Sequence, residues 1–171
     1  DTPNQWPVAV VWKNGILDTN LTNGNQTAHG NSIFVKNNNV YVAGYHWGGN
    51  QALAKIWENT EETVLGDISS SGSSFATSMT ITDNDDVYVL GHTQSQAATR
   101  TWKNGSSIQN LVPTQNAFAS NITSFGNDIY VSGRAKINPS DTGFRAVVWK
   151  NGEPTFVNTD ASSYTSCIFV K

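Results

Sequence analysis

Two tryptophans in this sequence lie beside amide side chains, a combination that suits carbohydrate binding. Trp6 follows an Asn-Gln pair, and Trp47 is followed by Gly-Gly-Asn-Gln. An indole ring can stack on the face of a pyranose while side-chain amides bind the sugar hydroxyls. Trp6 and Trp47 are therefore candidate ligand-binding residues, with packing over a surface loop as the alternative role for each ring.

Four further candidates follow a short motif that occurs three times, as NVYVAG, DVYVLG and DIYVSG. The residues just after its final glycine differ between the copies: Tyr45 and His46 in the first, His92 in the second and Arg134 in the third. Variable residues on a repeated framework are typical of binding loops, since loops bind ligands while the framework provides stability. We therefore expect these four residues to contribute to the same ligand-binding surface.

An aromatic residue also recurs ahead of this motif, at His29, Phe75, Phe118 and Tyr164, with spacings of 46, 43 and 46 residues. If these residues lead into the innermost strands of repeated sheets, their rings surround one mouth of a central channel. They would then form either a platform for a ligand or the filling of a narrow channel. The second role is favoured, because side chains fill the interiors of small closed β structures.

The acidic cluster Asp83, Asp85 and Asp86 is a secondary candidate for a calcium site, because hard cations prefer oxygen ligands. It falls in an expected hairpin turn, where aspartate is an ordinary residue, and it lacks the terminal glutamate of a calcium loop. The sequence contains no nucleophile elbow, zinc-protease motif or phosphate-binding glycine loop. It therefore favours a protein without catalytic activity and without a cofactor, and leaves open a carboxylate pair that meets only in three dimensions.

These candidate residues lie within or beside an internal sequence repeat. The stretch VVWKNG at 10–15 recurs unchanged at 147–152, and its tryptophan belongs to a series with spacings of 45, 45 and 47 residues. An Asn-Gly pair between two apolar runs is a strong hairpin signal. One large aromatic per repeat is expected to fill the space between neighbouring sheets. The members of the series are Trp12, Trp57, Trp102 and Trp149.

Each repeat is predicted to contain four short strands: an SIFV-like run, a VYVAG-like run, the run that ends in tryptophan, and a run after the Asn-Gly turn. β-Branched and aromatic residues are enriched in these runs, and no helical periodicity is present. Four antiparallel strands per repeat of about 45 residues are typical of a β-propeller blade. On these motifs the chain resembles bacterial extracellular β-propeller repeat proteins with YVAG and YWKNG repeats, over nearly its whole length. The resemblance implies an all-β propeller and no particular chemistry.

The repeats predict one domain, a small propeller of four blades. Three repeats cover approximately 31–66, 77–112 and 120–158, and residues 6–21 with 165–171 would form a composite blade that lacks its second strand. Because unpaired groups of an inner strand are costly to bury, we expect Pro7–Trp12 to pair directly with Cys167–Val170, which predicts a monomer. A second molecule that fills the gap, giving a dimer, and a fragment of a longer propeller are the alternatives.

Composition limits the classes of partner and the cellular locations that we expect for this protein. The chain has 37% hydrophobic residues, only 13% charged residues and a formal net charge of -3, which argues against nucleic-acid binding. No apolar run is long enough to predict membrane insertion, and the single cysteine, Cys167, excludes an internal disulfide. We therefore expect a lectin-like, secreted or cell-surface module that binds a glycan, with the bacterial periplasm as another compartment. The alternative is a structural or protein-interaction scaffold.

Overall fold

The structure of this protein is all-β. The computed structural model describes residues 6–65, 72–94, 99–109, 111–113, 116–158 and 162–171. Over these ranges it contains fourteen strands, and none of their residues forms a helix that could cross a membrane. The strands are β1 (Val10–Lys13), β2 (Ile16–Asn20), β3 (Ala28–Lys36), β4 (Asn39–Gly48), β5 (Gln51–Glu58), β6 (Glu61–Val64), β7 (Ser74–Ile81), β8 (Val87–Thr93), β9 (Thr99–Lys103), β10 (Ser106–Ile108), β11 (Ala117–Phe125), β12 (Asp128–Ala135), β13 (Arg145–Lys150) and β14 (Glu153–Phe156).

The strands form four antiparallel sheets, each built from strands that are consecutive in the chain. Strands β1 and β2 form a two-stranded sheet, and β3–β6, β7–β10 and β11–β14 form three four-stranded sheets. The predicted all-β class and the predicted division into four-stranded repeats are therefore confirmed. The Asn-Gly turns have the expected geometry: Asn104 and Gly105, for example, have φ angles of 50° and 82°. A type I′ turn requires positive φ at both of these positions.

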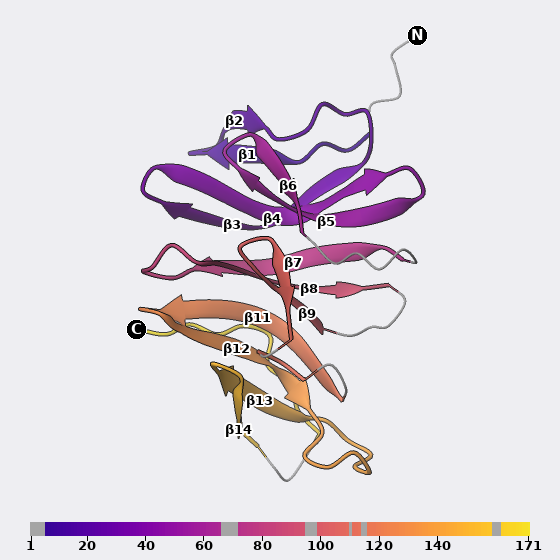
Figure 1. Cartoon of the computed structure of the whole chain (residues 1–171), viewed down its shortest axis with the longest axis vertical. Helices are drawn as coiled ribbons and strands as arrows, with labels where there is room; N and C mark the ends of the chain where they lie inside the picture. The colour runs from indigo at the N-terminus through magenta and orange to yellow at the C-terminus, as the bar shows by residue number, and fades with distance from the viewer. Residues whose placement is uncertain (1–5, 66–71, 95–98, 110, 114–115, 159–161) are drawn as a thin grey trace.

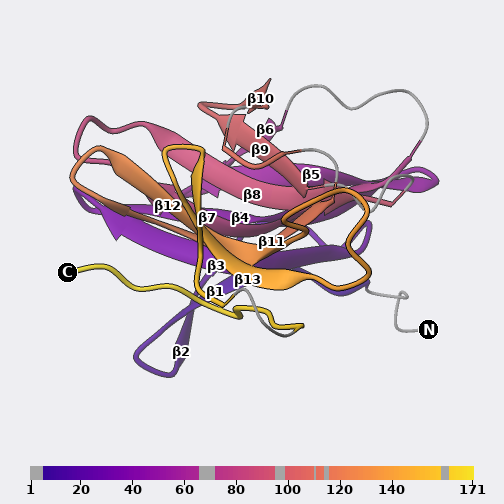
Figure 2. The same cartoon turned by 90° about the horizontal axis from the view of Figure 1, so that it is seen from below.

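The four sheets stack in chain order along the long axis of the molecule, with β1–β2 at one end and β11–β14 at the other (Figure 1). Seen along that axis, the sheets overlie one another; the outer strands β6 and β10 project to one side and β2 to the other (Figure 2). Three apolar clusters fill the spaces between neighbouring sheets. Trp57, Trp102 and Trp149 are each buried in one of these clusters, as expected for the repeat tryptophan.

The expected closure of the ring is not formed. Among the described residues, β1 pairs only with β2 and residues 162–171 contain no strand, so the predicted ladder between Pro7–Trp12 and Cys167–Val170 is wrong. The physical reason is separation: two complete sheets lie between β1 and residues 162–171, which run beside β11 (Figure 1). Trp12 also departs from the expectation for its series, because it is exposed at the free end of the stack.

Candidate functional site: a pocket with two tryptophans

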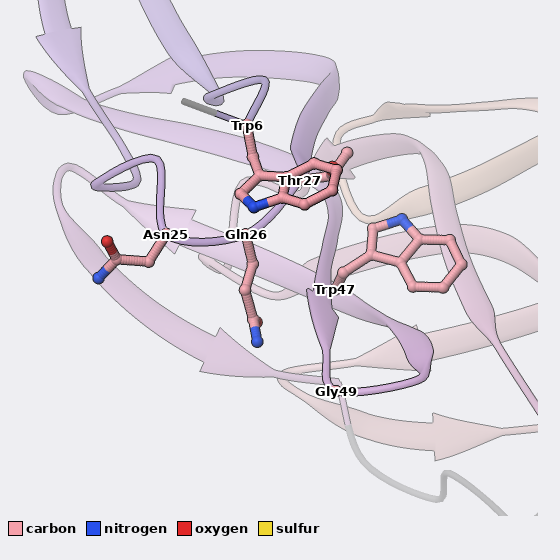
Figure 3. Close-up of a pocket in the computed structure, with 6 residues that line it drawn as sticks. All are labelled: Trp6, Asn25, Gln26, Thr27, Trp47 and Gly49. Atoms are coloured by element: carbon pink, nitrogen blue, oxygen red, sulfur yellow. The ribbon is translucent and has the colours of Figure 1, made fainter. Parts of the chain in front are cut away.

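One pocket, next to the first two sheets, brings together two tryptophans and two amide side chains. Its volume is about 320 Å³. Figure 3 shows the indole rings of Trp6 and Trp47 close to each other, with the side chains of Gln26 and Asn25 on the Trp6 side. The lining residues are Trp6, Asn25, Gln26, Thr27, Trp47 and Gly49. The two tryptophans that the sequence places outside the repeat pattern therefore share one site.

Backbone hydrogen bonds to the segment 24–27 hold the two tryptophans in place. The Trp6 N–H donates to the Gly24 carbonyl oxygen at 3.3 Å, and the Trp47 N–H donates to the Thr27 carbonyl oxygen at 2.9 Å. Gly24 and Gly49 have φ angles of 78° and 67°, a backbone conformation that glycine adopts without strain. The backbone of the amide-bearing segment is therefore hydrogen-bonded to the backbones of both tryptophans.

Trp47 reaches the pocket because β4 is extended. Strand β4 has ten residues, whereas its equivalents β8 and β12 have seven and eight. Trp47 lies in the added length, where it pairs with Ala52 of β5. Trp6 precedes β1 and is 55% exposed, and Trp47 is half-buried. Both rings can therefore present a face to a ligand.

The lining offers aromatic faces and neutral hydrogen-bonding groups. Two indoles, two carboxamides and a hydroxyl line the pocket, and none of the six lining residues ionises near neutral pH. Carboxamides both donate and accept hydrogen bonds, as the hydroxyl groups of a sugar do. The pocket is therefore suited to an uncharged, polyhydroxylated ligand.

His46 precedes Trp47 on β4 and lies on the opposite face of the strand, since side chains alternate. Its Nδ1 is 3.0 Å from Glu62 Oε2, and Glu62 also accepts hydrogen bonds from Lys55 Nζ (2.6 Å) and Trp57 Nε1 (3.2 Å). Burial raises the pKa of Glu62, but hydrogen bonds from Lys55 and His46 and the charges of both outweigh it and lower the pKa below its ordinary value. His46 therefore belongs to an ion-pair network outside the tryptophan pocket.

Tyr45 and His92 join His29 and Phe75 in a continuous row of rings. The ring centroids are 4.9 Å apart for His29 and Tyr45, 4.9 Å for Tyr45 and Phe75, and 5.2 Å for Phe75 and His92. Desolvation of its ring lowers the pKa of His92 and so favours the neutral imidazole. This row ties the sheet of β3–β6 to the sheet of β7–β10.

Arg134 and Phe118 belong to a separate cluster in the last sheet. The Arg134 guanidinium lies 5.0 Å from the Phe118 ring centroid and 5.3 Å from that of Phe144. Tyr164 is exposed beyond β14. Because the stack is open, His29, Phe75, Phe118 and Tyr164 form no ring around a channel mouth; the first two pack in the row and the third packs under Arg134.

The aspartates of the turn 83–86 hold neighbouring segments together. Asp85 pairs with Lys36 at 2.7 Å, and Asp86 pairs with Lys103 at 2.8 Å. The Asp83 N–H donates to a carbonyl oxygen in the next sheet at 3.1 Å. Within the described ranges, no group of three His, Cys, Asp or Glu side chains is placed to hold a metal ion. The acidic residues of this turn therefore have structural roles, in contacts with neighbouring strands and with the next sheet.

The amide-bearing segment of the pocket was not predicted from the sequence. Asn25, Gln26 and Thr27 lie between β2 and β3, far from Trp47 in the chain. The only signal in the sequence is the run of polar residues NGNQT at 23–27. That run predicts a turn, but it does not indicate which face of β4 the turn covers.

In comparisons with known proteins, no family model matches this chain, and no curated protein matches it in sequence. The function must therefore be inferred from the geometry of the site.

Proposed function

We propose that this protein is a non-catalytic, lectin-like module that binds a glycan in the pocket of Trp6 and Trp47. The observation that carries this proposal is the convergence of two indoles and two carboxamides on one pocket of about 320 Å³. Stacking on the indoles would supply the apolar contact for a sugar ring, and Asn25 and Gln26 would bind its hydroxyl groups.

The lining supports binding without hydrolysis. Glycosidases use a pair of carboxyl groups about 5–9.5 Å apart on either side of the scissile bond. None of the residues that line this pocket is acidic. Glu62, on the other face of β4, is held as a carboxylate by Lys55, so it is not a general acid for a ligand in the pocket.

We further propose that the four-stranded sheets are blades of the β-propeller type, side by side in an arc that one chain leaves open, and that the protein is located outside the cell or at the cell surface. The packing of first strands supports the arrangement, since β3 lies against β7 and β7 against β11. The low charge and the amide-rich loops support the location, because neutral polar surfaces suit glycans and not phosphate polymers.

A glycan array on the purified protein, followed by calorimetric titration of the best ligand, tests this function. Trp47→Ala and Trp6→Ala should each weaken the affinity per site by at least about 1 kcal/mol, the scale of one lost aromatic contact. Trp12→Ala is the matched control, because Trp12 is an exposed indole outside the pocket. Unchanged affinity in both pocket variants, or no glycan bound, would rule the proposal out.

A further inference from the structure

Neighbouring sheets are joined by a hydrogen bond that recurs at equivalent positions. The Met79 N–H of β7 donates to Ser32 Oγ of β3 at 3.2 Å, and the Ile122 N–H of β11 donates to Ser78 Oγ of β7 at 3.2 Å. Ser32 and Ser78 are equivalent because each directly follows the bulge of its strand. The first strands β7 and β11 are therefore each hydrogen-bonded to the first strand of the repeat before them, β3 and β7.

Residues 165–171 continue this pattern by one step. The Ile168 N–H donates to Asn121 Oδ1 at 3.4 Å, and Asn121 directly follows the bulge of β11, as the two serines do in their strands. The sequence SCIFVK at 166–171 also matches NSIFVK at 31–36. The segment thus lies on β11 in the place of a next first strand. Its outer side is uncovered, since Phe169 is 79% exposed.

Two interfaces between sheets also bury the same pair of residue types, a tryptophan and a leucine. Trp57 shares one cluster with Leu21 of the preceding sheet, and Trp102 shares another with Leu65. Leu21 and Leu65 are equivalent, because each follows a fourth strand and donates its N–H to an alanine carbonyl three residues before a repeat tryptophan. The indole of one sheet therefore packs with a leucine of the sheet before it.

The two ends of the stack each expose one half of this pair. Trp12 is 63% exposed, whereas Trp57 is 0% exposed. Val157 is the equivalent of Leu65, because its N–H donates to the carbonyl oxygen of Ala146, three residues before Trp149. Val157 is 66% exposed, whereas Leu65 is 0% exposed. One end thus presents an indole without its aliphatic partner, and the other presents the aliphatic side chain without an indole.

The end that exposes Trp12 also has room for a first strand. Ile33 is 55% exposed, whereas its equivalents Met79 and Ile122 are 4% and 3% exposed. Two adjoining pockets of about 270 and 350 Å³ share Val11, Trp12 and Ile33 and form a groove between β1 and β3. The groove lies where β3 would contact a preceding first strand.

We propose that this front end (Trp12, Ile33 and Val35) binds the back end (Val157 and residues 165–171) of a second copy of the chain. Segment 165–171 of the second copy would lie in the groove against β3, as β3 lies against β7, and its Val157 would cover Trp12. The two surfaces differ, so the contact is head-to-tail; it gives a closed ring where the rotation closes and a filament where it does not.

A second copy fits better than the chain's own end. The sheets of β3–β6 and β7–β10 lie between the two surfaces, so one chain does not bring them together in this structure (Figure 1). The sequence-based expectation of a monomer depended on the terminal ladder, which is not formed. This inference is independent of the proposed glycan binding.

Analytical ultracentrifugation over a series of concentrations tests the proposal. The wild-type protein should exceed the monomer mass as concentration rises, and Trp12→Ser and Val157→Asp should each weaken this association by about tenfold or more, as expected for a central anchor. Ile137→Asp is the control, since Ile137 is also exposed but lies outside both ends. A wild-type monomer at every concentration, or equal effects of all three variants, would overturn the proposal.

The interface between β7 and β11 supplies a directional test. Thr80 and Ser124 place their hydroxyl oxygens 2.7 Å apart there, and Phe169 and Val35 have the equivalent positions in segment 165–171 and in β3. One preparation would combine Cys167→Ser with Phe169→Cys, and the other Cys167→Ser with Val35→Cys. Mild oxidation of the mixture should give a disulfide-linked dimer with one chain of each kind. If a chain with all three substitutions forms the cross-link within itself and stays monomeric, its own ends meet and the proposal fails.

Discussion

The hydrogen bond that joins successive sheets has a measurable energetic consequence at Ser78. Ser78 is buried in β7, and its Oγ accepts hydrogen bonds from the Ile122 N–H at 3.2 Å and from Asn121 Nδ2 at 3.0 Å. Ser78→Ala removes the acceptor and leaves both donors in place. Because Ile122 is itself buried, its N–H cannot turn to solvent.

The expected loss follows from these two donors. A buried donor left without an acceptor costs about 1–3 kcal/mol, and the half-buried Asn121 amide costs less because water can reach it. We therefore expect Ser78→Ala to lower the free energy of unfolding by about 2–3 kcal/mol. Ser32→Ala should cost about 1 kcal/mol, because the half-buried Ser32 accepts one hydrogen bond within the described residues, from the Met79 N–H.

Urea unfolding followed by tryptophan fluorescence gives the free energies, and equal m-values would show that the same surface unfolds in each variant. Ser106→Ala is the control, because Ser106 is exposed and should change the free energy by less than about 0.5 kcal/mol. If Ser78→Ala is no less stable than Ser106→Ala, the hydrogen bond between the sheets does not stabilise the stack.

Two further predictions concern the glycine of the repeated motif and His92, whose ring stacks on Phe75. Gly91→Ala should prevent folding or strongly destabilise the protein, because a Cβ there would collide with the Phe75 carbonyl oxygen. Gly48→Ala is the control, since its Cβ meets only the end of a leucine side chain at 3.1 Å, and thermal unfolding compares the two variants. Burial lowers the pKa of His92, so the unfolded chain takes up this proton at a higher pH than the folded one. Stability from this group is complete above its ordinary pKa of about 6.5 and is lost as the pH falls below it. Denaturant unfolding at a pH of about 7.5 and about 5.5 should therefore show a smaller loss for His92→Phe than for the wild type, and equal losses would contradict the assignment.

Local signals in the sequence predict most of the fold. The tryptophan spacing and the Asn-Gly turns locate the hairpins, because a type I′ turn and alternating strands are determined by neighbouring residues. The burial of Trp57, Trp102 and Trp149 follows from the same repetition. The ends of the stack were predicted wrongly because the exposure of Trp12 depends on which sheet lies beside it, and no local pattern encodes that.

The sequence predicts the site only in part, because local patterns do not encode contacts between segments that are distant in the chain. Trp6 and Trp47 stand out because they break the repeat, and the structure places them in one pocket. Asn25 and Gln26 reach the pocket through backbone contacts between segments distant in the chain, which the sequence does not reveal. Tyr45 and His92 lie at the variable positions expected of ligand contacts. Their rings instead belong to a row between two sheets, in which Tyr45 packs on His29 and Phe75, and His92 packs on Phe75.

The most direct test of the proposed function is an NMR titration that observes the indole N–H signals of all six tryptophans. The titrant is the saccharide retained most strongly on a glycan array. The signals of Trp6 and Trp47 should shift together and saturate at one equivalent per chain, while those of Trp57, Trp102 and Trp149 stay in place. Shifts confined to other tryptophans, or no shift at saturating saccharide, would contradict the assignment of the pocket as the glycan site.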